Sequence, residues 1–518
     1  MQYAFYTRRR LLALLGAAAM VAVVAVAVSM ASSANAQAGK KPPGKSHHST
    51  GSHHGNNGNN GNNGNNGNNG NNGNNGGHKS KHGSHGLSIT STPWSPGTPP
   101  ATCTPPSGAV SLFTLQNGHR MTVNISNYGG VVQSISVPDR AGKQVNVALG
   151  FPTLLDYYCD FTQGQNKTSW PLPGGSGDTY FGAIIGRYAN RIADGSFTMT
   201  CSSCSNNGMT YTLDQNNGTN TLHGGFLGWN TVVWTPTTAV GSNFVALTLT
   251  AKLPAGEGCT GVNPTSCTGF PAPITATVTY TLTQDNQLRI DYSATNTSTT
   301  NEATVINLTN HTYFNLAGEG SGSVLHQLLA INADNYSPID TSFIPETPYF
   351  VPVGGTAFDF RTMKPIGQDI TNLNLPDGVG GTPYGPFGVG GTPSTPFDQL
   401  VIAHGYDHNW VLNGSGNRLV SVAQDLKNGI TLWTYTDQPG VQVYTGNFLV
   451  GDLSGLSQQT YRQTSAFTLE TQHYPDSPHH IGDPAWPSVV LNAGDTFTST
   501  TTYRFTTEGR GLRHHVHF

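Results

Sequence analysis

The feature that most constrains the fold of this chain is a two-residue alternation of apolar and small polar side chains. The alternating segments are 111–115, 121–125, 131–137, 145–149, 274–282, 288–294 and 496–506. Asn117-Gly118, between the first two segments, is the dipeptide typical of a tight hairpin turn. Between residues 111 and 507, apolar residues nowhere repeat at helical spacing over four turns, which disfavours α/β architectures. The pattern predicts an all-β fold, a large antiparallel β-sandwich over residues 108–509.

The charge content limits the class of partner. Charged residues make up only 10% of the chain, against roughly 25% in typical soluble domains, and the formal net charge is −3. A nucleic-acid partner requires a basic face, which this composition does not offer. Thr, Ser, Asn and Gly dominate instead, a mixture typical of short strands and many turns in an extracellular protein. We therefore expect no nucleic-acid partner.

The first 36 residues have the pattern of a signal peptide. Arg8, Arg9 and Arg10 precede an apolar run over 11–30, and small residues at 34–36 form a cleavage site. Residues 7–12 also resemble a twin-arginine signal, and the sequence favours neither export route over the other. An uncleaved run of this length could stay as a membrane anchor. The small-residue site favours cleavage, so we expect an exported protein, secreted, periplasmic or at the cell surface, without stable membrane insertion.

Residues 37–107 are predicted to be a disordered, low-complexity linker. Gly-Asn-Asn repeats without interruption over 55–76, His and Lys flank the repeat, and the end is rich in proline. No apolar residue within the repeat tract can bury surface. The flanking histidines could bind a transition metal, but without a fixed geometry a hydrated spacer is the simpler interpretation. Residues 510–518 are expected to form an exposed C-terminal tail.

Six cysteines follow the signal, and an even number in an exported chain favours disulfides. Local pairing is expected for Cys259 with Cys267 and for Cys201 with Cys204, which leaves Cys103 and Cys159 to pair. Cys-x-x-Cys at 201–204 could also be a redox pair or half of a zinc site. Because no second Cys-x-x-Cys and no helical context accompany it, a structural disulfide is preferred.

Five short segments concentrate side chains that can handle sugars and protons. They are 186–192 (GRYANRI), 222–225 (LHGG), 310–316 (NHTYFNL), 405–409 (GYDHN) and 469–472 (LETQ). Each alone has a structural explanation, because Asn and Gly shape turns and a His among apolar neighbours is usually a core residue. An Arg likewise often pairs with a surface carboxylate.

Taken together in this order, and with 438–442 (QPGVQ) and 444–447 (YTGN), these segments resemble the aldose 1-epimerase (galactose mutarotase) family. The resemblance covers about residues 111–507. It implies the galactose mutarotase-like supersandwich, in agreement with the alternation, and a reaction that needs no cofactor. It also implies that Glu470 is the general base and His311 the general acid. The residues implied to contact the sugar are Asn190, Arg191, His223, Asp407 and Gln442.

The residues of these segments allow two further interpretations. His404 and His408 flank Asp407 and, with His311, could be drawn as a zinc site. Strand and loop spacing does not guarantee that these side chains converge, so we predict no metal. The aromatic residues beside the motifs could pack on the face of a sugar or belong to the core: Tyr313, Phe314 and Trp410.

The leading functional prediction is an exported mutarotase that interconverts the α and β anomers of free aldohexoses such as galactose or glucose. A glycoside hydrolase is a weaker alternative, because such enzymes normally use two carboxylates rather than one Glu and one His. The third interpretation is a non-catalytic, tethered carbohydrate-binding protein. The matched acid and base argue against it, because a binding protein needs polar contacts but no such pair. Unusually long segments at 157–177, 259–273 and 375–396 leave the preferred sugar open.

Overall fold

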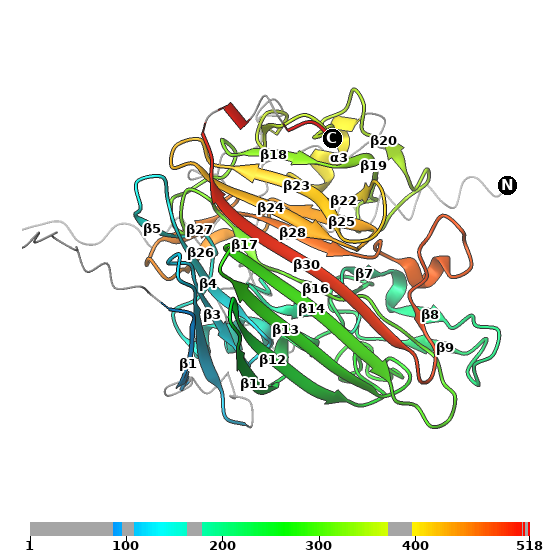
Figure 1. Cartoon of the computed structure of the whole chain (residues 1–518). Coiled ribbons are helices and arrows are strands. Elements are labelled where there is room, and N and C mark those ends of the chain that lie inside the picture. Colours follow the sequence, from blue (N-terminus) through cyan, green and yellow to red (C-terminus); the bar gives the residue numbers. More distant parts are fainter. Residues whose placement is uncertain (1–85, 96–107, 163–178, 371–395, 510, 513–515) are drawn as a thin grey trace, which may run out of the picture. The chain divides into compact units, whose positions relative to one another are not determined.

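The computed structural model describes residues 86–95, 108–162, 179–370, 396–509, 511–512 and 516–518 (Figure 1). The predicted signal peptide at 1–36, the Gly-Asn-Asn tract and the long segment at 375–395 lie outside the described residues. Within the described ranges, no helix is both long and apolar enough to cross a membrane.

The largest sheet has nine strands, and its long members cross the front of Figure 1. Its order is β11 (Thr235–Val240), β12 (Phe244–Leu253), β13 (Ile274–Thr283), β14 (Gln287–Asn296), β30 (Thr496–Thr507), β24 (Ile430–Thr436), β23 (Arg418–Gln424), β18 (Leu328–Ile331) and β21 (Lys364–Pro365). All its ladders are antiparallel. In β13, Val278, Tyr280 and Leu282 are fully buried, whereas the threonines between them are half-exposed, so one face points to the core.

A six-stranded sheet carries much of the site. Its order is β17 (Tyr313–Phe314), β28 (Phe467–Gln472), β25 (Gly440–Tyr444), β22 (Asp407–Leu412), β19 (Ala333–Ser337) and β20 (Val351–Pro352). Strands β25 and β28 are buried along their whole length. The register pairs Gln442 with Glu470. The Tyr503 hydroxyl of β30 donates to the Leu469 carbonyl of β28 at 3.0 Å, which ties this sheet to the nine-stranded one.

A five-stranded antiparallel sheet follows chain order and includes a strand that the sequence did not predict. Its strands are β1 (Ser88–Pro93), β2 (Ser111–Gln116), β3 (Thr122–Ser126), β4 (Val132–Pro138) and β5 (Gln144–Asn146). Strand β1 lies inside the expected linker at 37–107, so the linker prediction is wrong for 88–93. The physical reason is that Leu87 and Ile89 pack against the main core while β1 pairs with β2.

Short elements complete the described part. The two-stranded sheets pair β6 (Ile184–Ile185) with β16 (Thr309–Asn310), β7 (Arg191–Ile192) with β10 (Thr221–Leu222), β8 (Ser196–Thr198) with β9 (Thr210–Thr212), β15 (Thr304–Val305) with β29 (Val490–Leu491), and β26 (Val450–Ser454) with β27 (Thr460–Arg462). The helices are α2 (Leu154–Thr162) and α3 (Pro396–Ala403), with 3-10 turns η2 (Ala193–Gly195), η3 (Trp229–Thr231) and η5 (Ser477–His480). One core cluster joins residues of all three large sheets, such as Val123, Val278 and Leu469, as a sandwich requires.

The hairpins, the sandwich and two of the disulfides agree with the sequence predictions. Cys201 is bonded to Cys204 and Cys259 to Cys267. Cys159 is also disulfide-bonded, and its expected partner Cys103 lies outside the described residues. The exposed-tail prediction for 510–518 fails at the very end. Val516 is buried in a small apolar cluster, and the amide of Phe518 donates to the Arg361 carbonyl at 3.0 Å.

Candidate active site

A pocket of about 280 Å³ collects six of the seven predicted site residues. Its lining residues are Thr179, Tyr180, Asn190, Arg191, Asn216, Asn217, Leu222, His223, His311, Tyr313, Phe343, Asp407, Tyr444, Phe448, Leu449 and Glu470. The volume lies near the lower end of ligand pockets, roughly 300–1,000 Å³, and suits a small polar molecule. Gln442 is the exception, since it lies behind Asp407 rather than in the lining.

The predicted acid and base lie close together in the lining of this pocket. His311 follows β16 directly, and its backbone exchanges hydrogen bonds with the neighbouring strand segment, to Ala183 and from Gly182. Its Nε2 lies 3.5 Å from Oε1 of Glu470, which projects from β28. The Thr468 hydroxyl donates to the same Oε1 at 2.9 Å. Among the described residues, Glu470 Oε2 is buried without a hydrogen-bond partner, so its capacity to accept a hydrogen bond is unused.

The surroundings move the pKa values of the two groups in opposite directions. Burial, reinforced by the negative charge of Asp407, raises the pKa of Glu470 to about 8. Burial lowers the pKa of His311 to about 3. Between these values the pair holds one proton, which rests on Glu470 in the protein without substrate. Because the groups are close, their titrations are properties of the pair.

His223 is held in a defined tautomer. The Asn190 amide donates to His223 Nδ1 at 3.1 Å, and the His223 amide returns a hydrogen bond to the Asn190 carbonyl at 3.0 Å. Nδ1 is therefore an acceptor, and Nε2 carries the proton of the neutral ring. Burial and the neighbouring His311 lower the pKa of His223, which keeps the ring neutral. His223 thus offers one donor.

The side chains of His223, His311 and Glu470 bring potential metal-ligating atoms within 4.8 Å of one another. Two histidines and a carboxylate are a zinc-type donor set. Binding through Nε2 of His223 would, however, leave a proton on Nδ1 facing the Asn190 amide, two donors in conflict. The donor set therefore does not fit a metal. The zinc site drawn from His311, His404, Asp407 and His408 does not form either. His408 is fully buried outside the pocket lining, and its Nε2 lies 3.1 Å from Gln399 Oε1.

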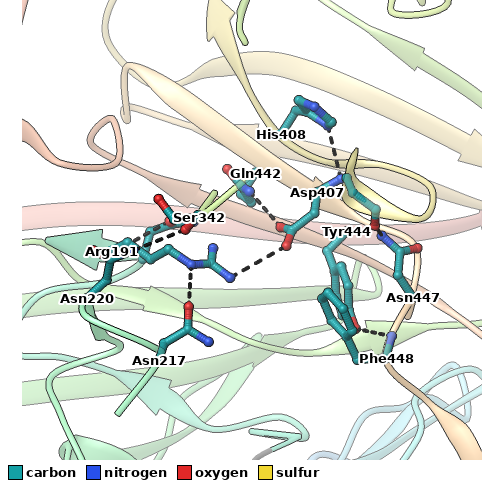
Figure 2. A network of polar contacts seen from close by, with 12 residues as sticks. Arg191, Asn217, Asn220, Ser342, Asp407, His408, Gln442, Tyr444, Asn447 and Phe448 are labelled. Carbon is teal, nitrogen blue, oxygen red and sulfur yellow. Dashed lines mark hydrogen bonds and ion pairs between the residues drawn. The ribbon is translucent and has the colours of Figure 1, made fainter. Parts of the chain in front are cut away.

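A second polar group, shown in Figure 2, centres on Arg191 and Asp407. The Arg191 Nε donates to Asn217 Oδ1 at 2.9 Å, and its Nη2 lies 3.9 Å from Asp407 Oδ2. Gln442 Nε2 donates to the other Asp407 oxygen at 2.7 Å. Because 3.9 Å is too long for a hydrogen bond, the guanidinium and the carboxylate both retain capacity for a ligand between them. Burial raises the pKa of Asp407, opposed by Arg191 and Gln442.

The sequence predictions missed much of the pocket wall, including Tyr180, Asn217, Phe343 and Phe448. Of the three aromatic residues considered, only Tyr313 lines the pocket. The other two belong to the core: Phe314 is fully buried, and Trp410 donates from Nε1 to the Phe358 carbonyl at 3.0 Å. No motif marked Tyr180, Asn217 or Phe343. Phe448 directly follows the 444–447 segment, and that adjacency is the one signal that could have found it.

Four lining residues have left-handed backbone conformations that bulky residues rarely adopt. The φ angles are 56° for Tyr180, 63° for Asn190, 53° for His223 and 66° for Phe343. Such conformations persist only where surrounding contacts determine them, and they cluster at functional sites. At Asn190 those contacts include its own Oδ1, which accepts from the Arg191 amide at 2.9 Å.

Comparison with known proteins places the chain in a family. The family model described as "Aldose 1-epimerase" matches residues 111–504. Galactose mutarotase of Rattus norvegicus is 35% identical over 399 residues, which cover 77% of this chain and 94% of the relative. Aldose 1-epimerase of Escherichia coli is 32% identical over 401 residues, or 77% of this chain and 95% of the relative.

Solved structures agree on the fold. A galactose 1-epimerase from Lactobacillus acidophilus superposes with a TM-score of 0.58 at 22% identity, covering 82% of this chain and 100% of the other. An aldose epimerase homologue from C. elegans gives a TM-score of 0.55 at 23% identity, covering 75% and 96%. At these identities the likeness concerns the fold alone, and it matches the sandwich described above.

Proposed function

The chain belongs to the aldose 1-epimerase family, and we propose that it interconverts the α and β anomers of free aldohexoses, with galactose and glucose as substrates, through Glu470 and His311. The observation that carries the proposal is the buried pair itself, with Nε2 and Oε1 at 3.5 Å in one small polar pocket. A binding protein needs polar contacts, but it does not need a carboxyl and an imidazole that share one proton.

Anomer exchange requires a base for the proton of the anomeric hydroxyl and an acid for the ring oxygen. As the Glu470 carboxylate removes the first proton, the bond between the anomeric carbon and the ring oxygen breaks and the carbonyl forms. The His311 imidazolium protonates the released oxygen. After the carbonyl end rotates, the same groups act in reverse and the ring closes with the other configuration, so no proton is consumed.

The form that reacts has the shared proton on His311 rather than on Glu470. The pair holds one proton across neutral pH, so this form is a tautomer of the resting site and forms without a net change of charge. A sugar hydroxyl that donates to the Glu470 carboxylate stabilises the charged form. The Nε2–H donor of His223, next to His311, supports a role in holding the sugar on the ring-oxygen side.

Arg191 and Asp407 are proposed to orient the remaining hydroxyls. Vicinal hydroxyls can donate to the carboxylate and accept from the guanidinium, and this orientation supplies much of the catalytic advantage for a small polyol. Gln442 donates to Asp407 Oδ1 and so fixes the carboxylate from behind. The choice of galactose rests on the names of the relatives and on a pocket sized for one monosaccharide.

Export is proposed from the sequence of residues 1–36, whose cationic start, apolar run and small-residue site form a signal pattern. A reporter that requires export, fused after Ala36, is expected to be active. Replacement of Arg8 and Arg9 by lysine should abolish this activity if the twin-arginine route is used and preserve it if the general route is used. A fusion that stays inside the cell with the intact segment would contradict export.

The proposed reaction is tested by polarimetry on freshly dissolved α-D-galactose and α-D-glucose. The protein is expected to accelerate the approach to the equilibrium rotation without changing its final value. A matched sample of His311→Ala should follow the uncatalysed rate. If neither sugar responds to the wild-type protein while calorimetry detects galactose binding, the carbohydrate-binding interpretation replaces the catalytic one.

A further inference from the structure

Phe343 stands out because its backbone conformation is costly and yet firmly held. It lies in the loop between β19 and β20, with φ at 66°, a left-handed conformation that is a genuine outlier for a bulky residue. Its ring lines the same pocket as Arg191 and Asp407. No family segment singled out this position, so its conformation calls for an explanation of its own.

The turn that carries Phe343 is closed by Asp340. The Phe343 amide donates to the Asp340 carbonyl at 3.0 Å, and the Asp340 amide donates to the Ile344 carbonyl at 2.9 Å. The Asp340 carboxylate accepts from the amides of Ser342 and Ile344 at 2.8 and 3.0 Å. These bonds on either side impose the backbone angle on Phe343.

The same turn is fastened to the segment that carries Arg191. Asn220 Nδ2 donates to the Ser342 carbonyl at 3.1 Å, and Asn220 Oδ1 accepts from the Asp194 amide at 3.1 Å. Figure 2 shows Asn220 and Ser342 beside Arg191. The loop is therefore placed relative to Arg191 by a side chain that bonds both segments.

The ring of Phe343 packs against the Arg191 guanidinium, whose polar partners lie at its nitrogen atoms. Asn217 and Asp407 meet the edge of the guanidinium, the former at 2.9 Å and the latter at 3.9 Å. The guanidinium carbon lies 4.7 Å from the centre of the Phe343 ring, a cation–π distance. A long side chain with one short hydrogen bond can rotate about that bond, and contact with a neighbouring ring restricts this rotation.

We propose that Phe343 is a positioning residue that holds Arg191 in its sugar-binding orientation, and that the strained turn is kept because it delivers the ring to this place. The inference rests on the proposed function, because that function gives Arg191 the role of contacting the sugar. It adds a residue that acts through Arg191 rather than by contact with the reacting atoms. The Phe343 ring also packs against the ring of Phe448, with 5.8 Å between the ring centres.

Three substitutions distinguish the effect of the Phe343 ring on sugar binding from the effect of its strained backbone on stability. Phe343→Leu keeps a bulky side chain on the strained backbone but removes the π face, so KM for galactose should rise about tenfold while kcat stays within about threefold. Phe343→Tyr, made as a separate single substitution, keeps the aromatic face, so its KM should stay within about twofold of wild type. Phe343→Gly removes the ring but accommodates the left-handed angle. Its KM should therefore match that of Phe343→Leu, and its melting temperature should be at least as high as that of Phe343→Leu.

The decisive control is a double-mutant cycle with Arg191→Gln. If Phe343 acts through Arg191, adding Phe343→Leu to Arg191→Gln should change KM by less than about twofold. An unchanged KM in Phe343→Leu, or an equal rise in both backgrounds, would overturn the inference. Galactose dissociation constants from calorimetry give the same comparison without turnover. A wild-type protein that binds galactose but does not anomerise it would refute the proposed function alone, leaving the cycle to decide on Phe343.

Discussion

At the scale of single residues, the site depends on how burial acts on groups of opposite charge type. Burial disfavours the charged form of each group, so it raises the pKa of Glu470 and lowers that of His311. Both groups are therefore uncharged at neutral pH in the protein without substrate. The residue types could be read from the sequence, but the location of the proton follows from the burial of both side chains, which no local pattern reveals.

This arrangement predicts the pH dependence of catalysis. Between about pH 3 and about pH 8 the pair holds one proton, so kcat/KM should be nearly constant over the neutral range. Above about pH 8 that proton is lost and no acid remains, so kcat/KM should fall about tenfold per pH unit. The measurement is polarimetry from pH 4 to pH 10 with the uncatalysed rate subtracted at each point. A decline that begins near pH 6.5 would contradict the shared proton.

At the scale of elements, the strand that bears Glu470 is linked to the segment that bears Arg191. Shortly after β28, the Asp476 amide donates to the Arg191 carbonyl at 2.9 Å, and Asp476 Oδ1 accepts from the Ala193 amide at 2.9 Å. His479 Nδ1 lies 2.7 Å from the same oxygen, and this contact raises the pKa of His479. The link fixes the position of Arg191 relative to β28.

We therefore expect Asp476→Ala to weaken sugar binding more than turnover. Loss of the carboxylate leaves the Ala193 amide without its acceptor and frees the Arg191 segment, so KM should rise about three- to tenfold with kcat changed by less than about threefold. Stability should fall by about 1–3 kcal/mol. Kinetic constants and thermal unfolding are the measurements.

Asp483→Ala is the matched control, because this exposed carboxylate accepts from the Ala485 amide in a nearby turn. It should leave both quantities close to wild type. Equal effects from the two substitutions would count against the link between β28 and Arg191.

How far the elements could be predicted depends on whether their cause is local. The hairpin of β2 and β3 follows from the alternation, and the structure contains it. The tight turn expected at Asn117-Gly118 is wrong, because Gln116 pairs with Thr122 and the left-handed conformation falls on Arg120 instead. The Phe343 turn depends on Asn220, more than a hundred residues away in the chain, and Tyr180 follows a segment with no recognisable pattern. Strand β1 was missed because six residues beside a low-complexity tract gave too short a signal.

At the scale of the whole molecule, the pocket draws its lining from residues 179 to 470, so it exists only when the large sheets have assembled. The described residues, all of which lie after residue 80, belong to one compact unit that contains every lining residue. Removal of residues 1–80 should therefore leave kcat and KM within about twofold of the full chain. A loss greater than about tenfold would show that the N-terminal segment contributes to catalysis.

A second truncation that begins at residue 108 tests the role of β1, provided that both chains carry Cys103→Ser where present and Cys159→Ser, so that neither has the expected disulfide. It exposes the edge of β2 and removes the packing of Leu87 and Ile89, so the melting temperature should fall relative to the chain that begins at residue 81. Aggregation on heating should also increase, because an unpaired strand edge can recruit other chains. Identical melting curves for the two chains would contradict the structural role of β1.

The most direct test of the catalytic assignment is the polarimetric rate of Glu470→Gln on α-D-galactose, measured beside wild type. Because Glu470 is uncharged in the protein without substrate, Gln should preserve the fold while losing the ability to accept a proton. We predict that kcat falls by about a hundredfold to ten-thousandfold while the calorimetric dissociation constant for galactose changes by less than about tenfold. A variant that anomerises galactose at the wild-type rate would show that Glu470 is not the base.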